Sequence, residues 1–350
     1  ISNMGLHHDD ILLSKKLLQP VTTLLALLAW LALLAIAILW RRSQPLFLFA
    51  VLFYLVAHSM ESSIWPLILV FEHRNYLPGV AVCLLMALLL IRALSMTERV
   101  RPGVPVFFIL SGMAVLLYIR VTTWSDPVHF SAVAVNNHPR SADAHYNHAN
   151  ILFGRSVELS QRNRQDPAVD ESLAMARHHY EMAYILDPSD IAALVMLYQL
   201  DSAHYPHLEK RDFWLQELMS ALENHVLRPT GWIAMGKLIK CFAAGACQGK
   251  GQHAPEIISI LDRRYPGHLR VVLLEYEYLN ENGTDTSSRI DFLEGAMGVF
   301  PDNLTLLKMV HSDYLDTGNT EKVLENARHM MRLDHRRRNL PVFQVAPDLP

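Results

Sequence analysis

The stretch PVTTLLALLAWLALLAIAILW, residues 20–40, decides the character of this chain. It runs for about 20 residues without a charge, which is the length that an α-helix needs to cross a bilayer. A helix buried in a soluble core would show a polar face at helical spacing, and this stretch shows none. The sequence therefore predicts a transmembrane helix here.

Three shorter apolar runs follow, at residues 45–60, 77–91 and 104–119. Each run reaches the lower limit of spanning length, and their clustering favours a membrane bundle over a soluble core. We therefore predict about four spans in a transmembrane domain of residues 18–121. An outer-side polar segment, residues 1–17, precedes it. The lipid bilayer is the first predicted partner.

The basic residues predict the orientation of this bundle. Arg41 and Arg42 lie in the link between the first two runs. Arg92, Arg99 and Arg101 lie near or in the link between the last two. Links rich in arginine face the cytoplasm, so the chain after Arg120 is predicted to lie outside it. The net charge of -3 gives no basic surface, which argues against nucleic acid as a partner.

From residue 122 onward the sequence has the character of helical repeats. Ala176, Tyr180, Ala183 and Pro188 are spaced by four, three and five residues, as in the second helix of a tetratricopeptide repeat. The alanines allow neighbouring helices to approach, the aromatic ring fills the groove between them, and the proline ends the helix. We expect an insertion at about residues 158–169 to lengthen the loop of this repeat.

A weaker repeat pattern at residues 302–334 extends this interpretation toward the end of the chain. The predicted fold class is therefore all-α, with a transmembrane helix bundle followed by a tetratricopeptide-repeat-like helical solenoid at residues 122–338. A generic helical bundle is the alternative for this part. An irregular tail, residues 339–350, is predicted to follow.

Two cysteines, Cys241 and Cys247, flank the small-residue loop CFAAGAC. In an oxidising compartment they could form a disulfide. Two unpaired small core residues are the alternative, and the sequence does not decide between them.

The segment between the second and third runs carries the candidate site. Its ionisable and polar aromatic side chains are His58, Glu61, Glu72, His73, Arg74 and Tyr76. Charges this close to a bilayer cost free energy unless they pair or contact a polar ligand, so a functional role is one interpretation. The planar guanidinium of Arg74 suits a phosphate, and the two histidines suit proton exchange near neutral pH. The alternative is a cap of ion pairs between two helix ends, with Tyr76 as an interfacial anchor.

The run HSMESSIWPLILVFEHRNYLP, residues 58–78, resembles a family of bacterial membrane proteins with C-type-glycosyltransferase-like membrane domains and extracytoplasmic tetratricopeptide repeats. This family is similar to the transmembrane and tetratricopeptide-repeat O-mannosyltransferases. The resemblance covers roughly residues 45–190, and FEHRNYLP, residues 71–78, is its most specific part. The resemblance implies transfer of sugar from a polyprenyl-phosphate carrier to a protein or glycan acceptor, on the periplasmic side of a bacterial inner membrane. The six residues above would then bind the carrier phosphate, and the repeats would engage the acceptor.

A looser resemblance links the chain to O-antigen ligases and polymerases, which also use isoprenoid-linked donors. A further alternative is a non-catalytic, membrane-anchored tetratricopeptide-repeat scaffold that gathers partner proteins.

The chain departs from the glycosyltransferase pattern in its catalytic motif. That motif is acidic and lies in the first outer loop, near the N-terminus of the family's proteins. We therefore expect that the catalytic residues lie upstream of Ile1 and that this fragment alone is inactive. The acidic pair Asp9 and Asp10 is not assigned to the motif. No cofactor is evident, and the sequence leaves a divalent metal open. His145 and His148, one helical turn apart, are interpreted as hydrogen-bonded histidines rather than zinc ligands.

Overall fold

The computed structural model describes residues 9–10, 16, 18–59, 75–95, 103–208, 210–245, 247 and 253–333. These residues form helices α1 to α15 and no β-strand, so the predicted all-α fold class is confirmed. The chain divides into two compact units, residues 1–176 and 177–350, within α7 (Pro167–Leu186). The boundary predicted after residue 121 falls in the last turn of α4 (Gly103–Trp124).

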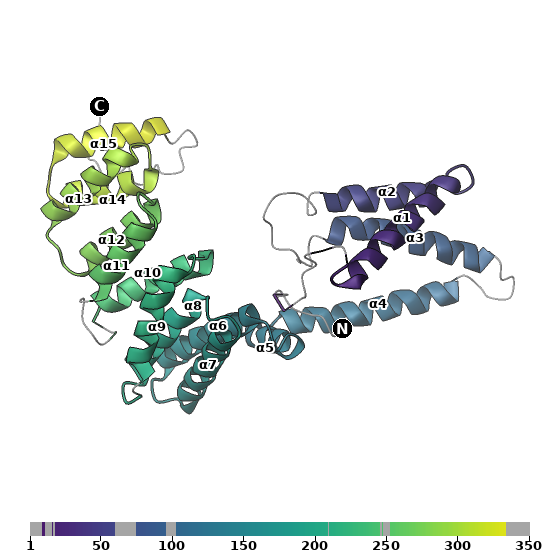
Figure 1. Cartoon of the computed structure of the whole chain (residues 1–350), viewed down its shortest axis with the longest axis horizontal. Helices are drawn as coiled ribbons and strands as arrows, with labels where there is room; N and C mark the ends of the chain where they lie inside the picture. The colour runs from purple at the N-terminus through teal and green to yellow at the C-terminus, as the bar shows by residue number, and fades with distance from the viewer. Residues whose placement is uncertain are drawn as a thin grey trace. The chain divides into compact units, whose positions relative to one another are not determined.

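Three helices of the first unit are long and apolar enough to cross a membrane: α1 (Val21–Leu39), α3 (Tyr76–Ser95) and α4. A shorter apolar helix, α2 (Pro45–Ser59), packs against both α1 and α3 (Figure 1). Few side chains of the three long helices are buried within the protein. Apolar helices that remain uncovered are suited to contact with lipid, which fits the predicted membrane bundle.

The apolar helix α4 is followed by the repeats after a short link. The carboxylate of Asp126 accepts a hydrogen bond of 2.9 Å from the backbone N–H of Val128 and caps α5 (Pro127–Asn137). Proline at the first helical position lacks the N–H that would otherwise be unsatisfied there. The rings of Trp124 and Phe130 lie 4.4 Å apart and pack the end of α4 against α5.

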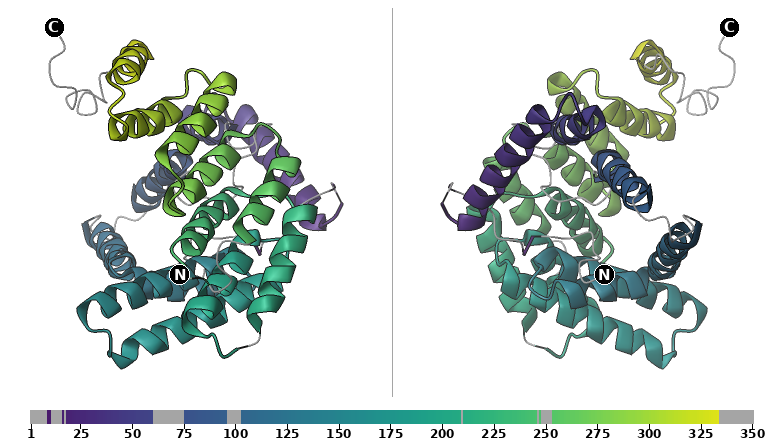
Figure 2. Two further views of the ribbon diagram at one scale, coloured as in Figure 1. Left: turned by 90° about the vertical axis from the view of Figure 1, so that its left-hand side faces the viewer. Right: turned by 90° about the vertical axis from the view of Figure 1, so that its right-hand side faces the viewer.

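The remaining helices follow one another in pairs. In the first unit, α5 packs against α6 (Ala142–Arg162). In the second unit, α8 pairs with α9, α10 with α11, α12 with α13, and α14 with α15, and α10 also contacts α8 and α12 (Figures 1 and 2). Contacts that run only between neighbours are the property of a helical solenoid. These helices are α8 (Ile191–His204), α9 (Lys210–Asn224), α10 (Pro229–Ala243), α11 (His253–Arg264), α12 (Leu269–Glu281), α13 (Thr286–Val299), α14 (Leu304–Asp316) and α15 (Thr320–Leu333).

The tetratricopeptide-like signature has the predicted role. Ala176, Tyr180 and Ala183 are fully buried, and Pro188 lies in the link after α7. A proline stands at the corresponding place before or at the start of each of α6, α8, α10, α12 and α14. Proline cannot continue a helix, so it ends one pair and lets the next begin. These prolines are Pro139, Pro188, Pro229, Pro266 and Pro301.

The prediction of a lengthened loop at residues 158–169 was wrong, because the extra residues extend the helices themselves. Helix α6 runs to Arg162 and α7 begins at Pro167, which leaves only residues 163–166 between them. An ion pair of 2.6 Å between Glu158 and Arg162 links two successive turns of α6. The carboxylate of Asp166 accepts from the backbone N–H of Ala168 at 2.9 Å and starts α7. The polar composition of this segment therefore belongs to solvated helix faces.

A buried ion pair joins α7 to α8. Arg177 donates to both carboxylate oxygens of Asp201, with nitrogen–oxygen distances of 2.6 and 2.9 Å. The indole N–H of Trp214, on α9, donates to the same carboxylate at 2.9 Å. The hydrogen bonds with Asp201 are the largest cause of the raised pKa of Arg177. The pair thus holds three successive helices together through one buried carboxylate.

The same arrangement recurs near the end of the solenoid. Arg289 on α13 donates to Asp313 on α14 at 2.6 Å, and the hydroxyl of Tyr276 donates to the same carboxylate at 3.1 Å. In both pairs the arginine and the aspartate are 24 residues apart in sequence. Burial and the neighbouring Asp313 carboxylate raise the pKa of Tyr276 to about 12. The two ion pairs therefore occupy equivalent positions in the repeats, each joining the second helix of one pair to the first helix of the next.

Candidate functional site

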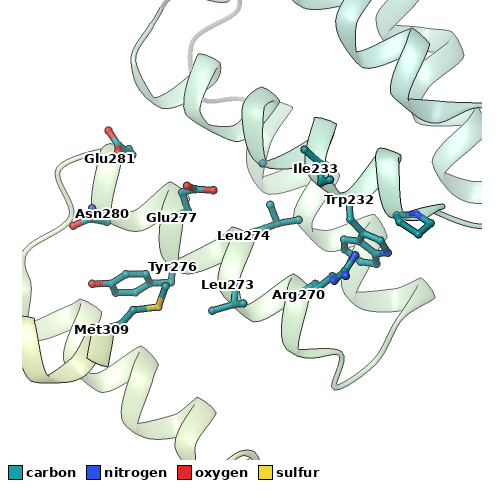
Figure 3. A pocket seen from close by; sticks show the side chains of 12 residues that line it. Trp232, Ile233, Arg270, Leu273, Leu274, Tyr276, Glu277, Asn280, Glu281 and Met309 are labelled. Carbon is teal, nitrogen blue, oxygen red and sulfur yellow. The ribbon is translucent and has the colours of Figure 1, made fainter. Parts of the chain in front are cut away.

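A groove with a volume of about 510 Å³ lies across α10, α12 and α14, the first helices of three successive pairs (Figure 3). This volume falls within the range of ligand-binding pockets. Apolar, aromatic, basic, amide and acidic side chains all contribute to its walls. The lining residues are Pro229, Trp232, Ile233, Gly236, Arg270, Leu273, Leu274, Tyr276, Glu277, Asn280, Glu281 and Met309.

The centre of the groove is apolar. Ile233 is 65% exposed, Leu274 is buried, and Leu273 and Met309 are partly buried at the same surface. Gly236 lines the groove without a side chain, and a Cβ atom there would make ordinary contacts with Glu277 Oε2 at 3.7 Å and a methyl group of Leu274 at 3.9 Å. An exposed isoleucine beside other apolar side chains offers a contact surface to a partner.

One end of the groove is cationic and aromatic. The ring of Trp232 stacks on the ring of His268 with centroids 5.1 Å apart and an angle of 5° between the planes. The guanidinium carbon of Arg270 lies 5.9 Å from the Trp232 ring centroid. The ring of Tyr265 also contacts this group, with its centroid 5.2 Å from that of Trp232. This ring contact holds Arg270 at the groove and uses none of its N–H groups as hydrogen-bond donors.

The opposite end of the groove is acidic and polar. Figure 3 shows Glu277, Asn280 and Glu281 together there, away from Arg270 and Trp232. Lys240 approaches this end and pairs with Glu277 at 2.9 Å. The hydrogen bond with Glu277 raises the pKa of Lys240, so this lysine stays charged at neutral pH.

The structure places two of the six side chains that the sequence proposed as a site. His58 lies in the last turn of α2, where its ring is 4.6 Å from that of Tyr54. Tyr54 in turn stacks on Trp30 of α1 at 5.1 Å. Tyr76 begins α3 and is exposed. The other proposed side chains lie outside the described residues; they are Glu61, Glu72, His73 and Arg74.

Tyr76 lines a shallow groove together with the end of α4. Arg120, Trp124 and Ser125 contribute the polar and aromatic part of this groove, and Leu117 contributes to its apolar part. Sequence reasoning gave Arg120 and Trp124 no role at a site. The signal was present in the sequence, because Arg120 follows a long apolar run and has aromatic neighbours, as at a membrane–water interface.

The acidic pair near the N-terminus has partners at the start of the repeats. The carboxylate of Asp10 lies 3.0 Å from Nδ1 of His138, and Asp9 accepts hydrogen bonds from the hydroxyl of Ser141 and, at 3.3 Å, from the backbone N–H of Asp143. These contacts join Asp9 and Asp10 to the link between α5 and α6 and to the first turn of α6. They give the pair a structural role.

The histidines of α6 have hydrogen-bond partners as well. Nδ1 of His148 lies 2.8 Å from the hydroxyl of buried Ser131, and Nε2 of His145 lies 3.2 Å from the carbonyl oxygen of Pro139. Burial, with a smaller contribution from His145, lowers the pKa of His148, so its neutral form is favoured. In the part of the chain that the structure describes, no group of three side chains is arranged to hold a metal ion.

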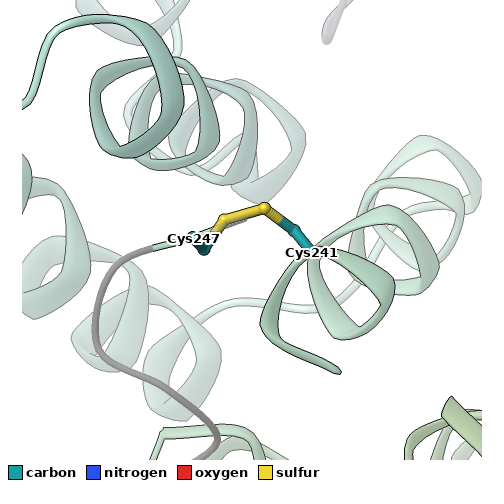
Figure 4. The surroundings of a disulfide bond; sticks show 2 residues. All are labelled: Cys241 and Cys247. Carbon is teal, nitrogen blue, oxygen red and sulfur yellow. A yellow bond between two sulfur atoms is a disulfide. The ribbon is translucent and has the colours of Figure 1, made fainter. Parts of the chain in front are cut away.

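Cys241 and Cys247 are joined by a disulfide at the end of α10 (Figure 4). Their sulfur atoms are 2.11 Å apart and their Cα atoms 5.3 Å apart. Cys247 is fully buried. The bond closes the small-residue loop onto the helix that lines the groove.

No protein-family model matches the chain, and no curated protein matches it. Among solved structures, the chain is similar to the human IFIT1 dimer with PPP-AAAA at 12% sequence identity and a TM-score of 0.32. The match covers 87% of this chain and 69% of the IFIT1 chain. At this TM-score the likeness carries no argument about function.

Proposed function

We propose that this chain is a membrane-anchored helical-repeat protein that binds a partner protein in the groove of α10, α12 and α14. The observation that carries the proposal is the groove itself, where Leu273 and Leu274 lie between a cationic and an acidic end and the 65% exposed Ile233 adds to the apolar surface (Figure 3). Solenoids bind partners along surfaces made by successive repeats, and here the first helices of three pairs supply the surface. Surfaces with an apolar centre and a polar rim are typical of protein–protein interfaces.

The proposed location is a plasma membrane, with the repeats on the extracytoplasmic side. Arg41 and Arg42 follow α1, and Arg92 lies near the end of α3. By the positive-inside rule these ends face the cytoplasm, which leaves the end of α4 and the repeats outside. The disulfide supports this orientation, because such bonds persist in oxidising compartments. For a bacterial chain this compartment is the periplasm.

Reporter fusions test the orientation. Alkaline phosphatase fused to the C-terminus of the full chain should be active, and a green fluorescent protein in the same place should be dark. The reverse result would place the repeats in the cytoplasm and remove this part of the proposal.

Photo-crosslinking in intact membranes tests the binding site. A photoreactive amino acid at Ile233 should give a covalent adduct with a partner protein. Ile185 is the matched control, because it is also 65% exposed but lies on α7, away from the groove. Gly236→Trp should abolish the adduct at Ile233 by filling the groove floor. Adducts of equal yield at both positions, or none at Ile233, would refute the proposed site.

A second candidate function is sugar transfer from a polyprenyl-phosphate carrier, as the resemblance of residues 58–78 implies. The contact of Tyr76 with the groove of Arg120 and Trp124 supports it, because a guanidinium and two aromatic rings suit a lipid-linked phosphate at the interface. On this proposal the repeat groove holds a protein acceptor.

The second candidate is tested by an assay of sugar transfer in membranes that contain the full chain. Transfer of a labelled sugar from a polyprenyl-phosphate donor should depend on Arg74 and Arg120, and Arg92→Gln is the control for a span-end arginine outside the Tyr76 groove. Absence of transfer with every isoprenoid donor would leave the anchored scaffold as the function.

A further inference from the structure

The two ends of the repeat groove carry opposite charge, and this polarity identifies the chemistry of its ligand. Arg270 provides a positive charge at the end near Trp232, while Glu277 and Glu281 provide negative charge at the other end (Figure 3). Leu273 and Leu274 lie between them on α12, and the exposed side chain of Ile233 lies beside Trp232 on α10 (Figure 3). A ligand that fits all three parts must carry an apolar side chain between an acidic group and a basic group.

We infer that the groove binds a short extended peptide segment in which one apolar side chain is flanked by an acidic residue and a basic residue. This inference rests on the proposed partner-binding function of the groove and names the chemistry of the bound segment. Arg270 would receive the carboxylate, Glu277 and Glu281 would receive the lysine or arginine, and the apolar side chain would rest on Ile233 and Leu273. Asn280 offers both a donor and an acceptor to the peptide backbone.

The geometry of α12 sets the spacing of the two charges in the ligand. At a rise of about 1.5 Å per residue, Glu277 lies ~10 Å and Glu281 ~16 Å along the helix from Arg270. An extended peptide advances about 3.3 Å per residue, so the acidic and basic residues should be roughly three to five positions apart. A peptide can run in either direction across the groove, so the order of the two charges along its sequence is free.

The floor of the groove is shaped to admit a side chain. Gly236 contributes no side chain, and a methyl group at this position would reach only ordinary contact distances from Glu277 and Leu274. Gly236→Ala therefore fits without displacing neighbours, while Gly236→Trp fills the space that the ligand side chain would occupy. The two substitutions at one position separate effects on helix folding from effects on the groove.

Substitution of Lys240 tests the proposal through an expected increase in affinity for the peptide. Its ammonium group pairs with Glu277 at 2.9 Å and is 60% exposed, so it competes with a basic side chain of the ligand for that carboxylate. Lys240→Gln removes the competing charge and leaves the groove walls in place. We expect the affinity for the peptide to rise about fivefold.

The experiment uses the full chain in lipid nanodiscs and fluorescence anisotropy of labelled seven-residue peptides with blocked termini. The test peptide carries one aspartate, one central leucine and one lysine on a serine background, with the aspartate and lysine four positions apart. Matched peptides replace the lysine by aspartate, the aspartate by lysine, or the leucine by serine. The test peptide should bind about tenfold more tightly than each of these, and binding should weaken as salt is added.

The variants locate the binding and assign its parts. Gly236→Trp should abolish binding and Gly236→Ala should preserve it. Arg270→Gln should remove the preference for the acidic residue, and Glu277→Gln combined with Glu281→Gln should remove the preference for the basic residue. Lys240→Gln should strengthen binding of the lysine-containing peptide only.

Three results would overturn the inference. Groove binding that Gly236→Trp abolishes, but that favours a peptide without the two opposite charges, would refute the ligand chemistry and leave the proposed function standing. Absence of binding for every peptide, together with a retained crosslink at Ile233, would show that the groove recognises a folded surface instead. Absence of both peptide binding and the Ile233 crosslink would refute the proposed function itself.

Discussion

Replacement of Asp201 by asparagine should destabilise α8 and α9 by about 3 kcal/mol, because it removes a buried counter-charge. Asp201 is fully buried and accepts two hydrogen bonds from Arg177 and one from Trp214. Removing one partner of a buried ion pair costs about 3–5 kcal/mol. The lower end applies here, since Arg177 keeps a second partner, Glu181, at 3.0 Å. Asparagine has nearly the same volume, so no cavity adds to this cost.

Hydrogen–deuterium exchange of the full chain in detergent measures this local stability. A loss of 3 kcal/mol corresponds to a roughly 150-fold faster exchange of the protected amides in α8 and α9. The Glu158–Arg162 pair provides the control, because its nitrogen–oxygen distance is also 2.6 Å but its side chains are 64% and 74% exposed. Glu158→Gln should cost less than about 0.5 kcal/mol, as exposed ion pairs do.

The double variant Arg177→Met with Asp201→Leu decides whether the buried charge is the cause. Replacing both members of a buried ion pair by apolar residues is often neutral, so the double variant should be more stable than Asp201→Asn alone. A residual cost of about 1 kcal/mol is expected because the indole N–H of Trp214 loses its acceptor. A double variant as unstable as the single one, or a single variant that loses less than about 1 kcal/mol, would refute this reasoning.

Three further perturbations follow from the structure. Loss of the disulfide through Cys241→Ser with Cys247→Ser should lower the stability of the repeats by about 2 kcal/mol, given the six-residue separation, and an unchanged melting temperature in thermal unfolding would contradict this. His311 is buried, and burial lowers its pKa. As the pH falls, the unfolded chain therefore binds a proton at this histidine before the folded chain does. The free energy of unfolding should be constant above pH ~6.5 in this respect and should decrease below it by at most about 1.4 kcal/mol per pH unit. His311→Leu should flatten this dependence in unfolding curves recorded from pH 7.5 to 5, and an unchanged slope would refute the assignment. Gly318 has a φ of 68°, so Gly318→Ala should cost about 1 kcal/mol and Gly318→Asn less, as measured by exchange in α14 and α15.

Local sequence features predicted much of the fold. Residues 20–40 have a length and an unbroken apolar composition that few structures other than a membrane helix accommodate. Ala176, Tyr180 and Ala183 were identified as a buried face because their spacing is a property of one helix. The insertion after Glu158 was misinterpreted for the same reason, since a polar helix face and a polar loop have similar composition. Local patterns therefore gave the elements but not always their lengths.

The groove was not predicted, because it depends on contacts between helices that are far apart in sequence. Ile233 on α10 and Leu273 on α12 are each ordinary apolar positions of an amphipathic helix. Only the packing of α10 against α12 places them at one surface beside Arg270 and Glu277. The repeated Arg–Asp spacing of 24 residues is a sequence signal for the contacts of α7 with α8 and of α13 with α14, and it gives no information on the contact of α10 with α12.

The Arg289–Asp313 pair also links the stability of the solenoid to the shape of its groove. Tyr276 lines the groove on α12 and donates its hydroxyl to Asp313 on α14, the helix that supplies Met309 to the same groove. In a solenoid each repeat contacts only its neighbours, so a local change acts mainly on the adjacent pairs. The Arg289–Asp313 pair therefore fixes one wall of the groove. The Arg177–Asp201 pair stabilises α8 and α9 and acts on the groove indirectly, through the packing of α8 on α10 and of α9 on α11. The two ion pairs have the same chemistry but different roles, because the groove lies beside only the Arg289–Asp313 pair.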